Sequence, residues 1–243
     1  MNPVENQTIV VSDLSNAEFL ERYAQPGRVG LSGGETLVDQ AIRRAERHLH
    51  PEAQWGLWSH AFVFQGRRLD GHQWIIESDL QFHHKHLRLG VQENRVSKYH
   101  DERFYTSLAV LDFSLGETQT GQLLSEALEL VASRTQYSVT ELFGTLIALR
   151  LSKLRSQENL LARDRSLFCS AFVQHLFRKA GLDLAPGVAV KNTTPEDLSR
   201  CQLPHTTWLL VRKAAPSQLE KMKTKVRRHV GARLRQIRRK IRQ

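Results

Sequence analysis

The 243-residue sequence has few cysteines and no long apolar run, and each absence excludes a class of protein. Two cysteines, Cys169 and Cys201, are too few for a disulfide framework, so we expect a reducing compartment. No stretch of about 18 apolar residues predicts a membrane-spanning helix. The first residues lack the basic and apolar segments of an ordinary secretion signal. We therefore expect a protein that is cytoplasmic or exported by a route independent of a signal peptide.

Net charge is also absent from most of the chain. Residues 216–243 hold 11 Lys and Arg and one Glu, which accounts for the whole net charge of +10. Residues 1–215 contain 24 basic and 24 acidic residues and are neutral overall. The high isoelectric point therefore belongs to the tail and says nothing about the chemistry of the body.

Apolar residues recur in the tail at intervals of three or four, which predicts a basic amphipathic helix of about 25 residues. Such a helix suits an anionic membrane surface, apolar side down. It equally suits docking on a protein partner or on the body of the chain. Nucleic acid ranks below both, because the tail lacks the aromatics that stack on single strands. The apolar residues of the stripe are Leu219, Met222, Val226, Val230, Leu234, Ile237 and Ile241.

Elsewhere, periodicity and turn residues predict helices beside hairpin-connected strands, without regular strand–helix alternation. This pattern favours an α+β fold with a small antiparallel sheet packed against helices. We divide the chain into a lead-in at 1–26, a body at 27–215 with a helical insert at 117–154, and the basic helix at 216–243. The expected helices are 16–24, 35–49, 117–134, 139–154 and 166–181, and the expected strands are 58–64, 73–78, 87–92, 106–113 and 206–212.

The helix expected at 166–181 carries Cys169 in its first turn. The positive end of the helix dipole and the unpaired N–H groups there favour a reactive thiolate. An alternative interpretation treats Cys169 as a small hydrophobic residue on a buried helix. A partner histidine elsewhere in the chain would decide between them.

The segment 58–78 supplies such a histidine. The strands 58–64 and 73–78 flank a polar turn that contains glycine and are typical of a β-hairpin. His60 begins the first strand and Glu77 ends the second, so a register close to symmetric about Arg68 makes them neighbours or places them one residue out of step. Glu77 would then orient the imidazole while its other nitrogen faces Cys169. Asp79 is the reserve for the third position.

Four segments resemble the circularly permuted branch of the NlpC-like, papain-like cysteine hydrolases. They are Trp-Ser-His-Ala-Phe-Val-Phe at 58–64, Trp-Ile-Ile-Glu-Ser at 74–78, Phe-Cys-Ser at 168–170 and Thr-Pro-Glu-Asp-Leu at 194–198. The resemblance covers about residues 27 to 212. In papain the cysteine comes first along the chain, whereas the order here is histidine, glutamate, cysteine.

This resemblance implies a papain-like fold and hydrolysis or acyl transfer at an amide, ester or thioester carbonyl. Cys169 would be the nucleophile, His60 the base and Glu77 the residue that orients His60. We expect Trp58, Ser59 and Ser170 to line the substrate groove. The expected substrates are peptides, peptidoglycan-like amides or lipid esters, and an effector delivered into another cell fits the absent secretion signal.

The sequence predicts no cofactor and no metal site. The histidines at 83, 84 and 86 have no cysteine or acidic partner at the spacing of a zinc site, and a solvated strand end explains them better. The alternative to an enzyme is a catalytically idle papain-like module that docks to a membrane or protein through its basic tail.

Overall fold

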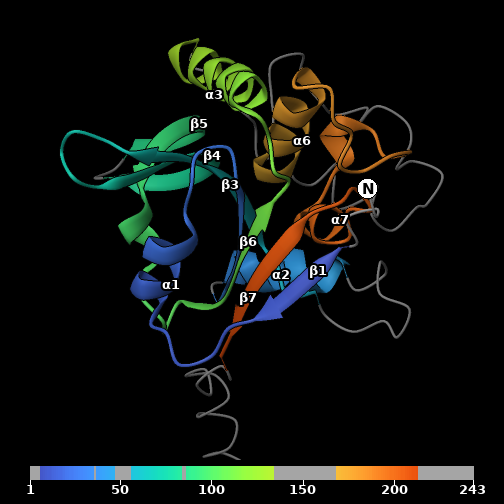
Figure 1. Ribbon diagram of the computed structural model, residues 1–243. Coiled ribbons are helices and arrows are strands. Elements are labelled where there is room, and N and C mark those ends of the chain that lie inside the picture. Colours follow the sequence, from blue (N-terminus) through green and yellow to red (C-terminus); the bar gives the residue numbers. More distant parts are fainter. Residues whose placement is uncertain (1–5, 36, 47–55, 84–85, 134–167, 213–243) are drawn as a thin grey trace, which may run out of the picture. The chain divides into compact units, whose positions relative to one another are not determined.

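A single mixed β-sheet organises the computed structural model, which describes residues 6–35, 37–46, 56–83, 86–133 and 168–212 (Figure 1). Within these ranges the sheet has seven strands in the order β1-β7-β6-β2-β3-β4-β5. All neighbouring strands are antiparallel except β1 and β7, which are parallel. The strands are β1 Gln7–Val10, β2 Val29–Gly34, β3 His60–Arg67, β4 Gln73–His83, β5 His86–Arg95, β6 Tyr105–Asp112 and β7 Thr206–Val211.

Helices pack on both faces of the sheet (Figure 1). The described helices are α1 Asn16–Tyr23, α2 Leu37–Glu46, α3 Glu117–Ala132, α6 Cys169–Lys179 and α7 Pro195–Ser199, with short 3₁₀ helices η2 Val96–Tyr99 and η3 Val190–Asn192. Their positions confirm most of the helices expected from periodicity. The helix expected at 139–154 and the basic helix at 216–243 lie outside the described residues.

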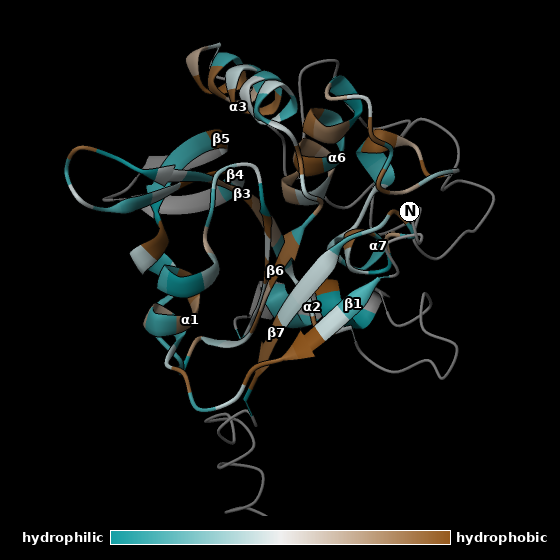
Figure 2. Cartoon of the chain, viewed as in Figure 1, coloured by the Kyte–Doolittle hydropathy of each residue, from teal (hydrophilic) through white to brown (hydrophobic). Residues whose placement is uncertain are grey.

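The core divides between the two faces of the sheet because successive side chains of a strand point to opposite sides. On one face α3 and α6 cover β-strand residues that include Val63 and Ile76. On the other face α1 and η2 cover Phe64 and Ile75, the next residues along the same strands. Figure 2 shows hydrophilic and hydrophobic residues alternating around α3, as a helix half-exposed to water requires.

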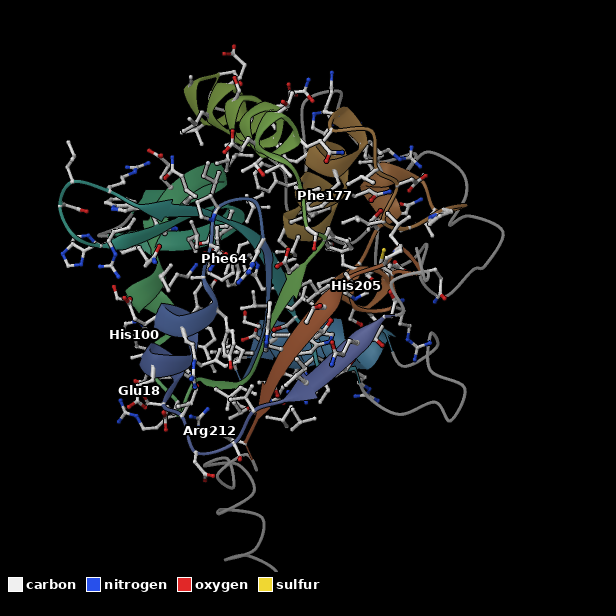
Figure 3. The ribbon with its side chains drawn as sticks, in the orientation of Figure 1. Glu18, Phe64, His100, Phe177, His205 and Arg212 are labelled. Atoms are coloured by element: carbon white, nitrogen blue, oxygen red, sulfur yellow. The ribbon has the colours of Figure 1, made fainter. Side chains whose placement is uncertain are left out.

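An aromatic contact ties α6 to the start of β7. Phe113 packs edge-on against Phe177 of α6 at a centroid distance of 5.1 Å and lies 4.9 Å from the ring of His205, just before β7. Figure 3 labels Phe177 and His205. Phe177 is fully buried. The contact helps to fix the helix that carries Cys169 against the sheet.

One expectation about local structure differs from the fold. Gly33 and Gly34 directly precede the helix expected at 35–49, but they do not open it: they end β2, pairing with Ser107 and Tyr105 of β6. The helix begins only at Leu37. The lead-in contributes β1, whose partner β7 lies at the far end of the body, a pairing that local sequence pattern does not encode. No described helix has both the length and the apolar character needed to cross a membrane.

Candidate active site

Cys169 is the first residue of α6. The helix begins at Cys169, three residues later than expected, with Phe168 as its N-cap and no side-chain capping bond. The hydroxyl of Ser170 donates to the carbonyl of Thr193 at 2.6 Å and anchors this end of the helix. Buried residues further along α6, among them Phe172 and Leu176, fix the helix on the sheet. The thiol of Cys169 is partly exposed at the positive end of the helix dipole.

His60 and Glu77 lie on adjacent strands of the β3–β4 hairpin. The ladder pairs Val63 with Ile76, and a bulge separates this pair from the Gly66–Trp74 pair. Carried one residue further, this register sets Glu77 opposite Phe62, so His60 and Glu77 are diagonal neighbours two residues out of step. Because a two-residue offset keeps side chains on one face of the sheet, the two side chains can still meet. The expected offset of at most one residue was too small, but the expected contact is present.

The three predicted residues come together through His60. Nε2 of His60 lies 2.7 Å from Oε2 of Glu77. Cys169 lies close enough to the same imidazole to raise its pKa. Since Glu77 occupies Nε2, the nitrogen left for Cys169 is Nδ1. The imidazole therefore lies between a sulfur atom and a carboxylate, as nucleophile activation requires.

Glu77 is fully buried and accepts three further hydrogen bonds. Asn94 Nδ2 and Lys98 Nζ each donate to Oε1 at 2.6 Å. The hydroxyl of Tyr99 donates to Oε2 at 2.5 Å. The carboxylate is held from β3, β5 and η2 at once, so its direction toward His60 is fixed.

The charges of the cluster favour an imidazolium next to a carboxylate. Burial lowers the pKa of His60, but Cys169 and Glu77 together outweigh it and raise this pKa well above the ordinary 6.5. Burial raises the pKa of Glu77, but the charge of Lys98 and the bond to His60 bring it far below the ordinary range. Burial and the adjacent Glu77 raise the pKa of Tyr99 well above 10, which keeps its hydroxyl a donor.

The remaining predicted residues have other positions. Asp79, the reserve for the third position, binds Lys98 rather than His60. Trp58, Ser59 and Ser170 are buried, at 5%, 2% and 2% exposed. The Ser59 hydroxyl accepts a hydrogen bond from the backbone N–H of Gly34. These three side chains offer little surface to a substrate, so the structure lends no support to their assignment to the groove.

A half-open cavity of about 310 Å³ lies at the other end of β2. Its lining includes Pro26, Arg28 and Asp112 but none of Cys169, His60 and Glu77. Arg28 and Asp112 already form an ion pair with each other at 2.8 Å. This cavity is therefore separate from the candidate site.

Sequence reasoning missed Asn94, Lys98 and Tyr99. They follow the third predicted strand, where no hydrophobic period or capping pattern marks them as functional. The one usable signal was the hairpin after Glu77, since pairing Glu77 with Gln92 brings the end of β5 and the start of η2 alongside. Asn94, Lys98 and Tyr99 reach Glu77 because β5 continues past residue 92 to Arg95 and η2 follows it directly.

No described group of three or more His, Cys, Asp or Glu side chains could hold a metal ion. The side chains of His83, His84 and His86 lie outside the described part of the chain. The sequence matches no protein-family model and no curated protein.

A solved structure, described as the metalloprotein YiiX from Escherichia coli O157:H7, DUF1105, resembles this chain with a TM-score of 0.50 and 12% sequence identity. The match covers 79% of this chain and 99% of YiiX. At this identity the likeness concerns the fold alone. It confirms the expected α+β, papain-like fold, here with a seven-stranded and mostly antiparallel sheet.

Proposed function

We propose that this protein is a cysteine hydrolase. The observation that supports it most is the position of the His60 imidazole, within reach of both Cys169 and the buried carboxylate of Glu77. A fold shared with YiiX agrees with a papain-like enzyme but does not identify the chemistry. Cys169 acts as the nucleophile, His60 as the base and Glu77 as the group that orients His60. These are the roles that the sequence resemblance implies.

In the proposed reaction the Sγ of Cys169 attacks a substrate carbonyl and forms a tetrahedral intermediate. The backbone N–H of Cys169, at the start of α6, stabilises the oxyanion. The imidazolium of His60 then protonates the leaving amine or alcohol as the acyl-enzyme forms. In the second half, His60 takes a proton from water, the hydroxide attacks the acyl group, and the thiolate leaves. Glu77 holds the ring in one orientation throughout.

The proposed substrates are amides of the peptide or peptidoglycan type and lipid esters. Both place an electrophilic carbonyl in front of the thiolate, and the described residues do not discriminate between them. An assay on peptides, peptidoglycan fragments and phospholipids, with wild type and Cys169→Ala in parallel, identifies the class.

The first test measures the thiol directly. We expect iodoacetamide to alkylate Cys169 at least about 100-fold faster than Cys201 at pH 7, because only a thiolate reacts. Cys201 is a built-in control: it is 3% exposed, and burial raises the pKa of its thiol. Peptide mapping by mass spectrometry gives both rates in one sample.

Cys169→Ala then separates catalysis from folding. We expect this variant to lose activity on whichever substrate the panel identifies, with a melting temperature within a few degrees of wild type. A variant that unfolds would support a purely structural cysteine. Equal alkylation of the two cysteines would argue for a catalytically idle module.

The second candidate function, docking by a catalytically idle module, is favoured by the distribution of charge along the chain. All of the net charge of +10 lies in residues 216–243, while the body is neutral. We propose that this segment attaches the protein to an anionic membrane surface or to a protein partner. Docking of this kind is compatible with catalysis and is also what an idle module would do.

A further inference from the structure

Lys98 bridges two carboxylates beside the candidate site. Its Nζ lies 2.6 Å from Oε1 of Glu77 and 2.5 Å from Oδ2 of Asp79. Glu77 is fully buried, whereas the side chains of Lys98 and Asp79 are 24% and 20% exposed. The row Asp79–Lys98–Glu77–His60 therefore runs from partly exposed groups to the buried carboxylate and on to the imidazole.

We propose that Lys98 is a positioning residue of the active site, anchored by Asp79, that keeps Glu77 ionised and aimed at His60. This inference rests on the proposed function, since it gives Lys98 a task in the same reaction. Lys98 touches neither Cys169 nor the reacting carbonyl. It acts only through Glu77.

The need for a cation follows from the burial of Glu77. A carboxylate without access to water holds its charge only when opposite charges and donors compensate it. Asn94 and Tyr99 supply neutral donors, and Lys98 supplies the permanent positive charge. His60 is positive only when it is protonated, so it cannot secure Glu77 throughout the reaction cycle.

Among the described residues, Lys98 is the one permanently charged cation that contacts Glu77. The charged and titratable groups around it are His60 from β3, Asp79 from β4, Lys98 and Tyr99 from η2, Tyr105 from β6 and, further out, Asp39 from α2. Asp79 and Asp39 are acids and the two tyrosines are neutral. Loss of Lys98 therefore leaves a buried carboxylate near other acids.

Asp79 acquires a role different from the one expected from sequence. It does not orient His60, because its carboxylate is bound to Lys98. By attracting the ammonium from the partly exposed side, Asp79 fixes the flexible lysine side chain at one end while Glu77 holds the other. The pair of contacts restricts Lys98 to a single position.

The test is the pH dependence of Cys169 alkylation by iodoacetamide in the full chain, from pH 5 to pH 8. In Lys98→Met, Glu77 takes up a proton at a higher pH, and a neutral Glu77 no longer stabilises the imidazolium that accompanies the thiolate. We compare the alkylation rate of Lys98→Met with that of wild type at each pH. We expect this ratio to be at least about tenfold lower at pH 5 than at pH 8, since a shift of one pH unit is a factor of ten. Lys98→Arg keeps the charge and should restore the wild-type profile.

Asp79→Asn is the matched control, because it breaks the same ion pair from the other side. It removes a negative charge near Glu77, so its acid limb should not move to higher pH. If the ion pair between Lys98 and Asp79 only stabilised the fold, Asp79→Asn and Lys98→Met would show the same pH profile of Cys169 alkylation. If Lys98→Met does not fold, Lys98→Gln carries the same expectation, because it also lacks the charge.

A ratio of variant to wild type that is constant with pH would overturn the role of Lys98. Failure of the role proposed for Lys98 is distinguishable from failure of the proposed hydrolase function. If wild-type Cys169 reacts no faster than Cys201, the hydrolase proposal fails before any variant is compared. If wild type reacts preferentially and Lys98→Met keeps its pH profile, only the positioning role is refuted.

Discussion

Glu77 is the side chain at which the charges of the candidate site converge. Four groups donate to its two oxygens, and three of them come from outside its own hairpin. A carboxylate so fixed gives His60 one orientation. The same contacts link the ionisation of Glu77 to the stability of the fold.

We expect Glu77→Gln to lower the free energy of unfolding by up to about 3 kcal/mol at pH 7, because it removes one member of a buried charge cluster. Folding lowers the pKa of Glu77, so its contribution is present above the ordinary value of 4.5 and is lost as pH falls below it. The difference between variant and wild type should therefore shrink from pH 7 to pH 3. Urea unfolding at several pH values measures it.

The control for Glu77→Gln is Glu126→Gln. Glu126 pairs with His175 at 2.8 Å, but both side chains are more than a quarter exposed. Removing this pair should change the free energy of unfolding by less than about 1 kcal/mol. A Glu77→Gln effect that stays constant across the pH range would contradict the buried ionised carboxylate.

At the residue scale, sequence predicted the partners but not their support. His60 and Glu77 followed from a hairpin, and Cys169 from a helix start, both of which are local patterns. The exact offset could not follow, because the bulge beside Gly66 shifts the register. Lys98 and Tyr99 were unpredictable since their function depends on where η2 lies in space.

Among the elements, β2 shows how a strand supports a site that it does not carry. Gly30 pairs directly with Phe62 of β3, and a Cβ at Gly30 would overlap the Phe62 ring. Phe62 stacks on Tyr99 at a centroid distance of 4.5 Å, and Tyr99 donates to Glu77. A missing methyl group on β2 thus leaves room for the ring that positions Tyr99.

Gly30→Ala tests this chain of contacts. Because Phe62 is fully buried and cannot rotate away freely, we expect a loss of about 1–3 kcal/mol in the free energy of unfolding. Cys169 alkylation should slow as Tyr99 moves away from Glu77. Thermal unfolding and alkylation kinetics measure the two effects.

Gly121→Ala on α3 is the control for Gly30→Ala, since nothing lies within 4 Å of its Cβ. It should leave alkylation unchanged and stabilise the protein by up to about 1 kcal/mol through helix propensity. A Gly30→Ala variant as stable as wild type would show that Phe62 can repack. In that case the contact from β2 to Tyr99 would not constrain the site.

Elements with local signals were predicted well. The strands expected at 58–64 and 73–78 around a polar turn correspond to β3 and β4. Elements that depend on distant partners were not predicted well. Gly33 and Gly34 directly precede an expected helix, but they belong to β2 through pairing with β6. Pairing over long sequence distances leaves no periodic pattern in either strand.

For the whole molecule, the outstanding property is the separation of charge along the chain. We expect the full chain to sediment with vesicles containing anionic phospholipid at low salt and to be released at high salt, because screening weakens the attraction. Vesicles of zwitterionic lipid should bind much less. The domain boundaries proposed at 26 and 215 stay predictions.

A charge-reduced tail provides the control for vesicle binding. Replacing Arg227, Arg228, Arg238 and Arg239 by Gln removes four positive charges and keeps the apolar stripe. Each charge near the surface contributes about 1 kcal/mol, so binding should fall by several orders of magnitude. Absence of wild-type binding to anionic vesicles would leave a protein partner as the proposed target of the tail.

The parallel pairing of β1 with β7 has a consequence for how the chain is made. Gln7 pairs with Thr206, so β1 acquires this neighbour only after the long segment between them has been synthesised. His60 and Glu77 can meet early within their hairpin, whereas Cys169 joins them only after more than 90 further residues have been synthesised. Contacts over such separations close slowly. A nascent chain would thus hold its acid–base pair ready well before the sulfur that it is proposed to activate.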